Sequence, residues 1–252
     1  MNSKNKKFSL MYNYIIGFVS FLLIWELLHV LLRTHTIPSP LDTIIFMCKH
    51  IPQLMKHCGA SLLSVVVAIL ISLVVGVPLG IILGVNETIK KFCSPLLYFI
   101  YPIPKVAFLP VFMLLFGLGN TSKIILVIWI IIFQIILSVR DGVTQIPRLY
   151  GKVMDSFSAN QIQKYRYLIL PAILPQIIGG LRISIGISLA SLFFAENYAT
   201  KFGIGYYILS AWTKMNYIEM FSGILALGFV GILLFLLLDR IEVACAPWVK
   251  KL

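Results

Sequence analysis

Long apolar runs separated by short polar segments dominate the hydropathy pattern of the chain. Ala60 to Val85 contains no Asp, Glu, Lys or Arg, and neither does Met220 to Leu238. An uncharged run of about 18 or more residues is long enough to cross the hydrocarbon core of a bilayer as a helix. The pattern therefore predicts an all-α integral membrane protein and excludes an ordinary soluble fold.

We expect about six transmembrane helices within one transmembrane domain that covers 1–252. Their approximate bounds are Tyr14–Leu32, Ser61–Gly84, Cys93–Gly117, Lys123–Val139, Ile177–Ala195 and Met220–Leu238. The first of them is longer than a typical signal-peptide core, and no small-x-small cleavage site follows it. We therefore expect a retained span, with a cleaved signal peptide as the alternative.

The net charge of +12 is explained by membrane topology, so no nucleic-acid partner is expected. With the N-terminus in the cytoplasm, the inner segments hold more Lys and Arg than the outer segments. The inner set includes Lys90, Lys91, Arg140, Arg148, Lys152 and Arg240, and the outer set includes Lys49, Lys56, Lys123, Lys201 and Lys214. The positive-inside rule then places both termini in the cytoplasm.

The longest polar stretch, at about 140–175, falls on the cytoplasmic side. It contains no G-x-x-x-x-G-K-S/T phosphate-binding loop. Any ATP hydrolysis must therefore come from another polypeptide, and we do not expect this chain to be an enzyme.

Gly76, Gly80 and Gly84 are spaced four residues apart in the second span. Four-residue spacing places them on one helix face, where small residues allow close backbone approach. We expect a helix-packing surface, and internal packing within one subunit is favoured over packing on a moving partner helix. Pro78 predicts a kink in the same helix.

The third span carries Pro95, Pro102, Pro104 and Pro110. Pro102 and Pro104 should interrupt the helix, because each removes a backbone donor and clashes with the preceding turn. Lys105 follows at once, and a cation is costly in hydrocarbon. The break either lines a polar path, which makes Lys105 a translocation-path candidate, or lets Lys105 reach the lipid headgroups.

Glu196 and Asn197 close the fifth span near its outer end. An ionisable residue there is a candidate for a gate or a solute contact, so both are translocation-path candidates. Simple exposure at the interface is the alternative. Arg182 lies near the cytoplasmic end of the same span, where headgroup or backbone contact is expected.

A segment with two cysteines and two histidines lies on the predicted outer side, at Cys48, His50, His57 and Cys58. These residue types bind metals, but their spacing fits no standard zinc pattern. We expect no metal site, and an amphipathic helix at the interface is the favoured interpretation.

The cytoplasmic stretch 151–167 is expected to form an amphipathic helix that presents Phe157 among small and polar residues. An exposed aromatic on a short helix suits a cleft on another protein. A helix lying on the membrane is the alternative.

Several motifs together resemble the permeases of type I ABC importers, in the branch for sulfonate, taurine and nitrate. They are Ile-Pro-Ser-Pro at 37–40, Tyr-Pro-Ile-Pro-Lys-Val-Ala at 101–107, Phe-Gly-Leu-Gly at 116–119, Leu-Pro-Ala-Ile-Leu-Pro at 170–175, Gly-Gly-Leu-Arg at 179–182 and Gly-Ile-Gly-Tyr at 203–206. Each motif is weak alone, but their order and spacing over nearly the whole chain are strong. The resemblance implies the type I importer permease fold.

The chain departs from this family at the segment that contacts the ATPase. The family's version usually starts Glu-Ala-Ala and has a glycine six positions after the Glu. Here 152–159 reads Lys-Val-Met-Asp-Ser-Phe-Ser-Ala, with Ser158 at the glycine position. The residues to which the resemblance assigns ATPase coupling are Met154, Asp155, Ser156, Phe157, Ser158 and Ala159.

The resemblance also implies partners and a mechanism. A second permease copy, as a homodimer, two ATPase subunits and an extracytoplasmic substrate-binding protein would complete the importer in a bacterial or archaeal inner membrane, in contact with lipid. ATP and Mg²⁺ would bind the ATPase, and this chain would bind no cofactor. Motion of the ATPase dimer would drive alternating access around a path for a small, anionic solute.

An ATP-independent secondary transporter or channel is the main alternative, because such proteins also carry broken helices and buried charges. A membrane enzyme is a second alternative, but it needs a cluster of catalytic side chains that the sequence does not offer. The identity of the solute stays open at this point.

Overall fold

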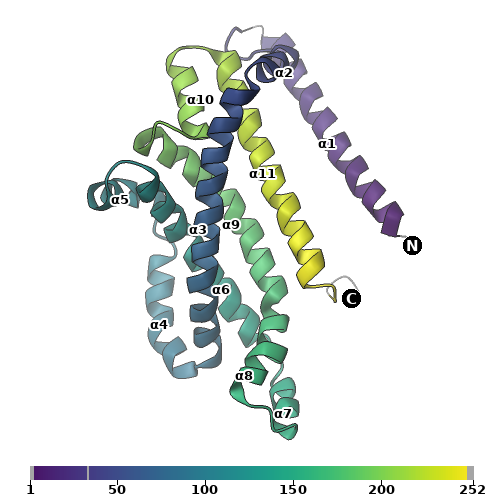
Figure 1. Ribbon diagram of the computed structural model, residues 1–252, viewed down its shortest axis with the longest axis vertical. Helices are drawn as coiled ribbons and strands as arrows, with labels where there is room; N and C mark the ends of the chain where they lie inside the picture. Colours follow the sequence, from purple (N-terminus) through teal and green to yellow (C-terminus); the bar gives the residue numbers. More distant parts are fainter. Residues whose placement is uncertain (1–2, 33, 249–252) are drawn as a thin grey trace.

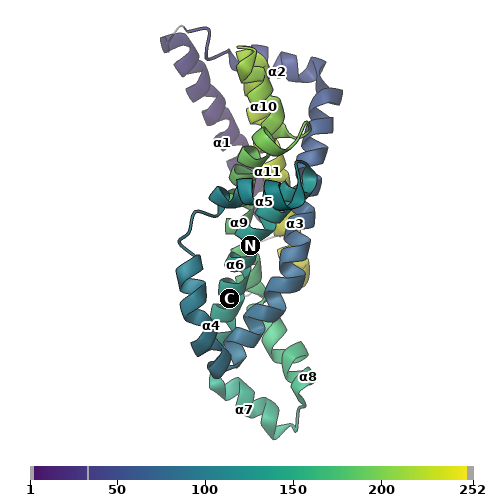
Figure 2. The same cartoon turned by 90° about the vertical axis from the view of Figure 1, so that its left-hand side faces the viewer.

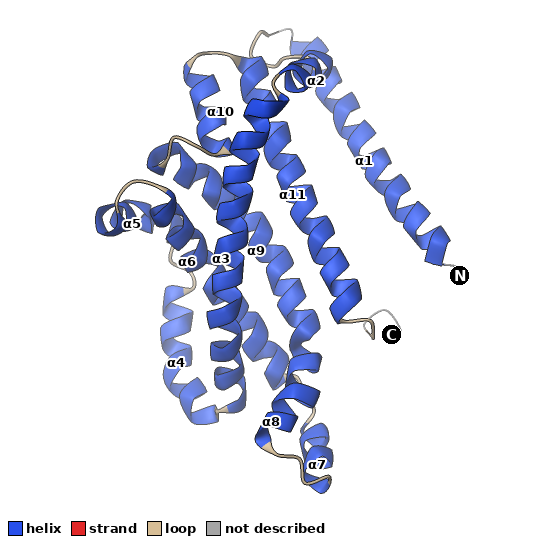
Figure 3. Cartoon of the chain, viewed as in Figure 1, coloured by secondary structure: helices blue, strands red, loops and turns tan. Residues whose placement is uncertain are grey.

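The structure is a computed structural model that describes residues 3–32 and 34–248. Every regular element in these residues is helical, as predicted (Figure 3). The helices are α1 (Ser3–Leu32), α2 (Pro40–Lys49), α3 (Ile51–Val85), α4 (Glu87–Ile100), α5 (Leu109–Phe116), α6 (Asn120–Thr144), α7 (Arg148–Ser156), α8 (Gln161–Lys164), α9 (Leu170–Ala199), α10 (Ile204–Thr213) and α11 (Tyr217–Cys245). A 3-10 turn, η1 (Lys105–Phe108), precedes α5, and a π-helical turn, η2 (Tyr165–Ile169), precedes α9.

Four long helices, α3, α6, α9 and α11, run along the molecule (Figures 1 and 2). The short helices α2 and α10 lie at one end, hereafter the α10 end, and α7 and α8 lie at the other, hereafter the α7 end. Helix α1 diverges from α11, and α1 begins and α11 ends on the side away from the α10 end. The chain is thus elongated, with different short helices at its two ends.

Fewer helices are long and apolar enough to cross a membrane than the six expected. Four meet that description in the described residues, namely Ile51–Val85, Asn120–Thr144, Gln161–Tyr198 and Tyr217–Cys245. The pair Glu87–Ile100 and Lys105–Phe116, which is bent by 84°, makes a fifth if the two helices count as one broken span. The first predicted span corresponds to α1, whose described apolar part, Ile16–Leu32, is shorter.

The expected interruption of the third span is confirmed. Its two helices, α4 and α5, are separated at the two prolines and meet at the 84° bend. The physical reason is the one that the sequence offered, because a proline has no backbone N–H to donate to a helical hydrogen bond.

Helix α6 forms the centre of the bundle, between α3 and α9. The buried core joins these helices to α11 through Val65, Val127, Ile131, Ile135, Ile178, Leu192 and Leu234. Burial of such branched apolar side chains holds the helices in register by dispersion contacts, since lipid supplies little hydrophobic drive for helix association.

The glycine face of α3 lies directly on α6 of the same chain. Methyl groups at Gly76, Gly80 and Gly84 would meet Ile135, Val139 and Val143, one turn after another. At Gly80 the added carbon would lie 2.6 Å from Val139 Cβ and 2.9 Å from the Ile136 carbonyl oxygen. The absence of side chains here lets the two backbones approach closely.

We predict that Gly80→Ala lowers the stability of the bundle by about 1–3 kcal/mol, because the methyl group overpacks a closed interface. Gly59→Ala is the matched control, since Gly59 lies on the same helix with nothing within 4 Å of the added carbon. Alanine favours a helix over glycine by up to about 1 kcal/mol, so the control should be neutral or stabilising. Thermal unfolding of the two variants in detergent checks this, and equal melting temperatures would contradict it.

Candidate functional site

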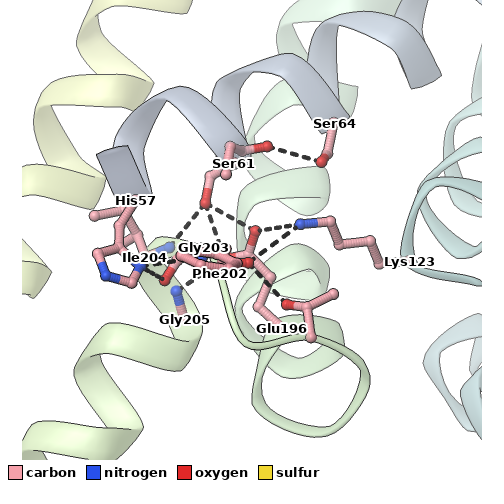
Figure 4. A network of polar contacts seen from close by, with 11 residues as sticks. His57, Ser61, Ser64, Lys123, Glu196, Phe202, Gly203, Ile204 and Gly205 are labelled. Atoms are coloured by element: carbon pink, nitrogen blue, oxygen red, sulfur yellow. Dashed lines mark hydrogen bonds and ion pairs between the residues drawn. The ribbon is translucent and has the colours of Figure 1, made fainter. Parts of the chain in front are cut away.

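A buried polar network lies at the α10 end of the bundle, around the carboxylate of Glu196 on α9 (Figure 4). The Ser61 hydroxyl of α3 lies 2.8 Å and 2.9 Å from the two carboxylate oxygens. The backbone N–H of Gly205 donates to Glu196 Oε2 at 2.9 Å. The backbone N–H of Ile204 donates in turn to Ser61 Oγ at 2.9 Å.

The charge of Glu196 is balanced by Lys123 of α6. The Lys123 ammonium lies 3.2 Å from Glu196 Oε1 and 3.5 Å from the Phe202 carbonyl oxygen. The side chains of Lys123 and Glu196 are 0% and 1% exposed. A buried carboxylate or ammonium is strongly unfavourable alone, so each of these two charges depends on the other.

Two glycines allow the segment 200–205 to close over the carboxylate. Gly203 has φ of +141°, and a side chain there would overlap the Glu196 carboxylate. A side chain at Gly205 would lie 2.6 Å from the Phe193 carbonyl oxygen. Packing therefore explains the Gly-Ile-Gly pattern, because a side chain at Gly203 or Gly205 would collide with neighbouring atoms.

His57 of α3 completes the network beside Gly203. Its Nδ1 atom lies 3.0 Å from the Gly203 carbonyl oxygen and 3.2 Å from the Gly203 nitrogen, and the tautomer decides which of them is its partner. The ring also packs near Tyr207 of α10, with centroids 5.2 Å apart. The network thus joins α3, α6, α9 and α10 at one point.

The structure places the path candidates Glu196 and Asn197 in this buried polar network. Glu196 is enclosed by protein and is not exposed at an interface. With its amide nitrogen turned toward the backbone, Asn197 donates to the carbonyl oxygens of Gly205 at 2.7 Å and Phe193 at 3.3 Å. Within the chain, both side chains therefore fasten the segment 200–205, and Glu196 presents no free carboxylate to a solute.

Lys123 was expected in an outer segment and proves to be a buried member of α6. Helix α6 begins at Asn120, which draws Lys123 inside the bundle. The available signal was the coincidence of an acid and a base near the same predicted membrane depth, since intramembrane charges pair with one another. Nothing in the sequence marks Ser61 or His57 as their neighbours.

Lys105 lies in a different place, at the bend between α4 and α5. Its ammonium donates to the Tyr101 carbonyl oxygen at 2.8 Å and lies 5.0 Å from the centroid of the Tyr101 ring. It also lies 5.5 Å from the Phe133 ring. The structure therefore does not bring Lys105 together with Glu196 and Asn197.

The six candidate coupling residues lie at the α7 end (Figure 1). Met154, Asp155 and Ser156 form the end of α7, and Phe157, Ser158 and Ala159 lie between α7 and α8. Phe157 ends α7 and is 80% exposed. Ser158 adopts φ of +54°, in the left-handed region that favours glycine. Asn160 then starts α8 with a capping box, in which its side chain and that of Gln163 each bond the other's backbone.

Arg182 is paired within the protein rather than simply exposed to headgroups. Its guanidinium lies 2.6 Å from Asp239 and 2.9 Å from Glu242, both on α11. This bridge ties α9 to α11 in the half of the bundle away from the α10 end.

The Cys/His segment is not gathered into a ligand set. Residues 48, 50, 57 and 58 are spread over α2, the turn after it and α3, and His57 is engaged by Gly203. In the described part of the chain no group of three or more His, Cys, Asp or Glu side chains is placed to hold a metal ion. The structure therefore gives the metal hypothesis no support.

Comparison with known proteins places this arrangement in context. Residues 76–251 match the family model described as binding-protein-dependent transport system inner membrane component. The taurine transport system permease protein TauC of Escherichia coli is 31% identical over 77% of this chain and 71% of its own length. The nitrate import permease protein NrtB of Synechococcus elongatus is 26% identical over 99% of this chain and 92% of its own length.

A further relative and a solved structure agree with these matches. The formylaminopyrimidine transport permease protein ThiX of Halalkalibacterium halodurans is 27% identical over 93% of this chain and 94% of its own length. A chain of the MetNI methionine ABC transporter superposes with a TM-score of 0.69 at 19% identity, covering 78% of this chain and 98% of that one. At that identity the superposition shows the fold alone.

We predict that Glu196→Gln destabilises the protein by about 3–5 kcal/mol, because it leaves the Lys123 ammonium buried without a counter-charge. The double variant Glu196→Gln with Lys123→Met should lose less than the sum of the single variants, as expected for coupled residues. Thermal unfolding in detergent measures both effects.

The control for this prediction is Glu87→Gln, which breaks the exposed Glu87–Lys90 pair of 3.4 Å. An exposed pair contributes about 0–1 kcal/mol, so this variant should unfold almost as the unmodified chain does. If Glu196→Gln matches Glu87→Gln, the buried pair does not hold the α10 end together.

Proposed function

The chain belongs to the family of binding-protein-dependent transport system inner membrane components, and we propose that it imports a small anionic solute. It is a multi-pass permease subunit of an ABC importer of the sulfonate and nitrate branch, and not an enzyme. ATP hydrolysis takes place on a separate ATPase subunit, and a substrate-binding protein delivers the solute. The match over 76–251 is the observation that carries this assignment.

The proposal of an anionic solute is supported by the relatives. Those named above include permeases for taurine and nitrate, and a putative aliphatic sulfonate permease, SsuC of Bacillus subtilis, is 26% identical over 77% of this chain. All three names specify a nitrate or sulfonate compound, although the ThiX relative is named for a pyrimidine.

We place the α7 end in the cytoplasm and the α10 end outside. The start of α4 and the helix α7 lie toward the α7 end, and they carry Lys90 and Lys91 and Arg148 and Lys152, respectively. Lysine and arginine are enriched in cytoplasmic segments, which supports this orientation. Both termini would then also be cytoplasmic, and the substrate-binding protein would dock at the α10 end.

We further propose that Met154–Ala159 is the contact to the ATPase. Phe157 projects from the turn between two short helices, at the part of the molecule farthest from the α10 end. Further exposed apolar side chains occur on α7, α8 and η2, namely Leu149, Tyr150, Val153, Ile162 and Tyr167. An exposed aromatic amid apolar side chains is suited to a hydrophobic cleft on a partner.

The complete importer that we propose holds two copies of this chain and two ATPase subunits, with ATP and Mg²⁺ on the latter. Closure of the ATPase dimer would move the α7 ends, and the two permeases would then alternate between inward and outward access. We place the second copy against the flank formed by α4 and α5, which exposes Phe92, Phe99 and Leu114.

We predict that Phe157→Asp abolishes co-purification of the ATPase from membranes, because it places a charge where an aromatic ring enters an apolar cleft. Trp212→Asp is the control, since Trp212 is 58% exposed on α10 at the opposite end. The control should retain the ATPase. If no ATPase accompanies even the unmodified chain, the chain works as a secondary transporter or channel instead.

The left-handed backbone at Ser158 generates a second prediction for this contact. Ser158→Gly should retain the ATPase and stabilise the turn by about 1 kcal/mol, because the strain of a side chain at positive φ is removed. Ser158→Val should weaken ATPase co-purification, since a β-branched residue disfavours this conformation most. Equal recovery of the ATPase with both variants would show that the contact does not need this turn geometry.

A further inference from the structure

The lysine and arginine residues on α6 and α9 are each paired with a carboxylate, but Lys105 is not. The paired ones are Lys123 with Glu196 at 3.2 Å, Arg140 with Asp141 at 2.7 Å and Arg182 with Asp239 at 2.6 Å. Among the residues that the structure describes, no carboxylate lies within ion-pair distance of Lys105. Its positive charge is therefore uncompensated within the chain.

The contacts of Lys105 hold the ammonium in place without neutralising it. One of its three N–H donors is used by the Tyr101 carbonyl oxygen, at 2.8 Å. The rings of Tyr101 and Phe133 lie 5.0 Å and 5.5 Å away and attract the cation by their quadrupoles. The other two donors meet no acceptor in the described part of the chain, so they are free to bind one.

A second donor group, the Gln134 amide, contacts the same Tyr101 at its hydroxyl end. The Tyr101 hydroxyl donates to Gln134 Oε1 at 3.0 Å, which turns the amide nitrogen of Gln134 away from Tyr101. That nitrogen has only a contact of 3.5 Å to Ser138 Oγ. Lys105 and Gln134 thus both adjoin Tyr101 with spare N–H donors.

The bend that carries Lys105 cannot face hydrocarbon. It lies about half-way between the two ends of the molecule, at the junction of α4 and α5 (Figure 2). Tyr101 is 44% exposed, and Pro102 and Pro104 are also exposed. Irregular backbone at membrane depth is tolerated only where protein or a water-filled cavity covers it. The exposed side of the bend therefore faces the aqueous path or the other subunit beside it.

We propose that Lys105 binds the negatively charged group of the solute during its passage, with the Gln134 amide as a neighbouring donor. This inference rests on the proposed import of a small anion. A single lysine supplies one compact charge with rotatable donors, which suits a monovalent oxyanion such as nitrate or a sulfonate. A single contact of this kind is also weak enough to release the ion, as transport requires.

A purely structural role for Lys105 makes a different prediction. If the side chain only caps the Tyr101 carbonyl oxygen at the end of α4, a neutral donor should replace it. Lys105→Gln keeps an N–H donor but removes the charge, and Lys105→Arg keeps the charge but changes the shape. Lys91→Gln is the matched control, because Lys91 is an exposed lysine on α4, the helix that precedes the bend.

The experiment uses the complete importer, with its ATPase and binding protein, in proteoliposomes that contain ATP. Uptake of nitrate, taurine and ethanesulfonate is measured at saturating concentration for each variant. Lys105→Gln should lower anion uptake about tenfold or more, the loss expected for one charge-assisted contact. Lys105→Arg should retain most of the uptake and Lys91→Gln all of it. Co-purification of the ATPase and basal ATP hydrolysis should be the same in every variant.

Two results would overturn the proposal alone. Undiminished uptake by Lys105→Gln would show that the charge is not needed, and equal loss in Lys105→Gln and Lys105→Arg would show that shape rather than charge matters. If the unmodified importer takes up none of these three compounds but does take up a solute without an anionic group, the proposed solute class fails first. Lys105→Met, similar in length, replaces the Gln variant if that variant does not assemble with the ATPase.

Discussion

The ion pair between Lys123 and Glu196 determines how one end of this permease is built. Both charges are enclosed by protein, where neither is tolerable alone, so α6 and α9 must stay together. The same carboxylate accepts from Ser61 and from the Gly205 backbone, which draws α3 and the segment before α10 onto the pair. Four elements therefore share one electrostatic centre, and separating any of them breaks several contacts together.

The rest of the bundle is arranged around this fixed end. The glycine face of α3 and the core of α6 extend the close packing toward the α7 end. Between the two ends, the ion pair of Arg182 with Asp239 joins α9 to α11. In the part of the chain that the structure describes, α7 and α8 contain no buried residue, so they offer no comparable buried network at the α7 end. An apolar contact surface on a short projecting element suits a subunit that receives motion from an ATPase and passes it to rigid helices.

Much of this organisation could be predicted from the sequence, and the missing parts have physical reasons. Uncharged runs define the long helices, and Pro102 and Pro104 define the break, because both effects are local. Only their similar predicted depth in the membrane hints at the pairing of Lys123 with Glu196, since the two residues lie 73 positions apart and their contact depends on the exact start of α6. A path role for Glu196 stays a prediction, and within the chain its carboxylate fastens the segment before α10.

What the sequence predicts about Lys105 is limited in the same way. The sequence places Lys105 beside a helix break, but it does not reveal that the lysine and arginine residues on α6 and α9 have carboxylate partners. The most direct test of the whole account is ATP-driven uptake by purified components in proteoliposomes. Accumulation of the anion should require this chain, its ATPase and the binding protein together. Accumulation by this chain alone, driven by an ion gradient, would contradict the account.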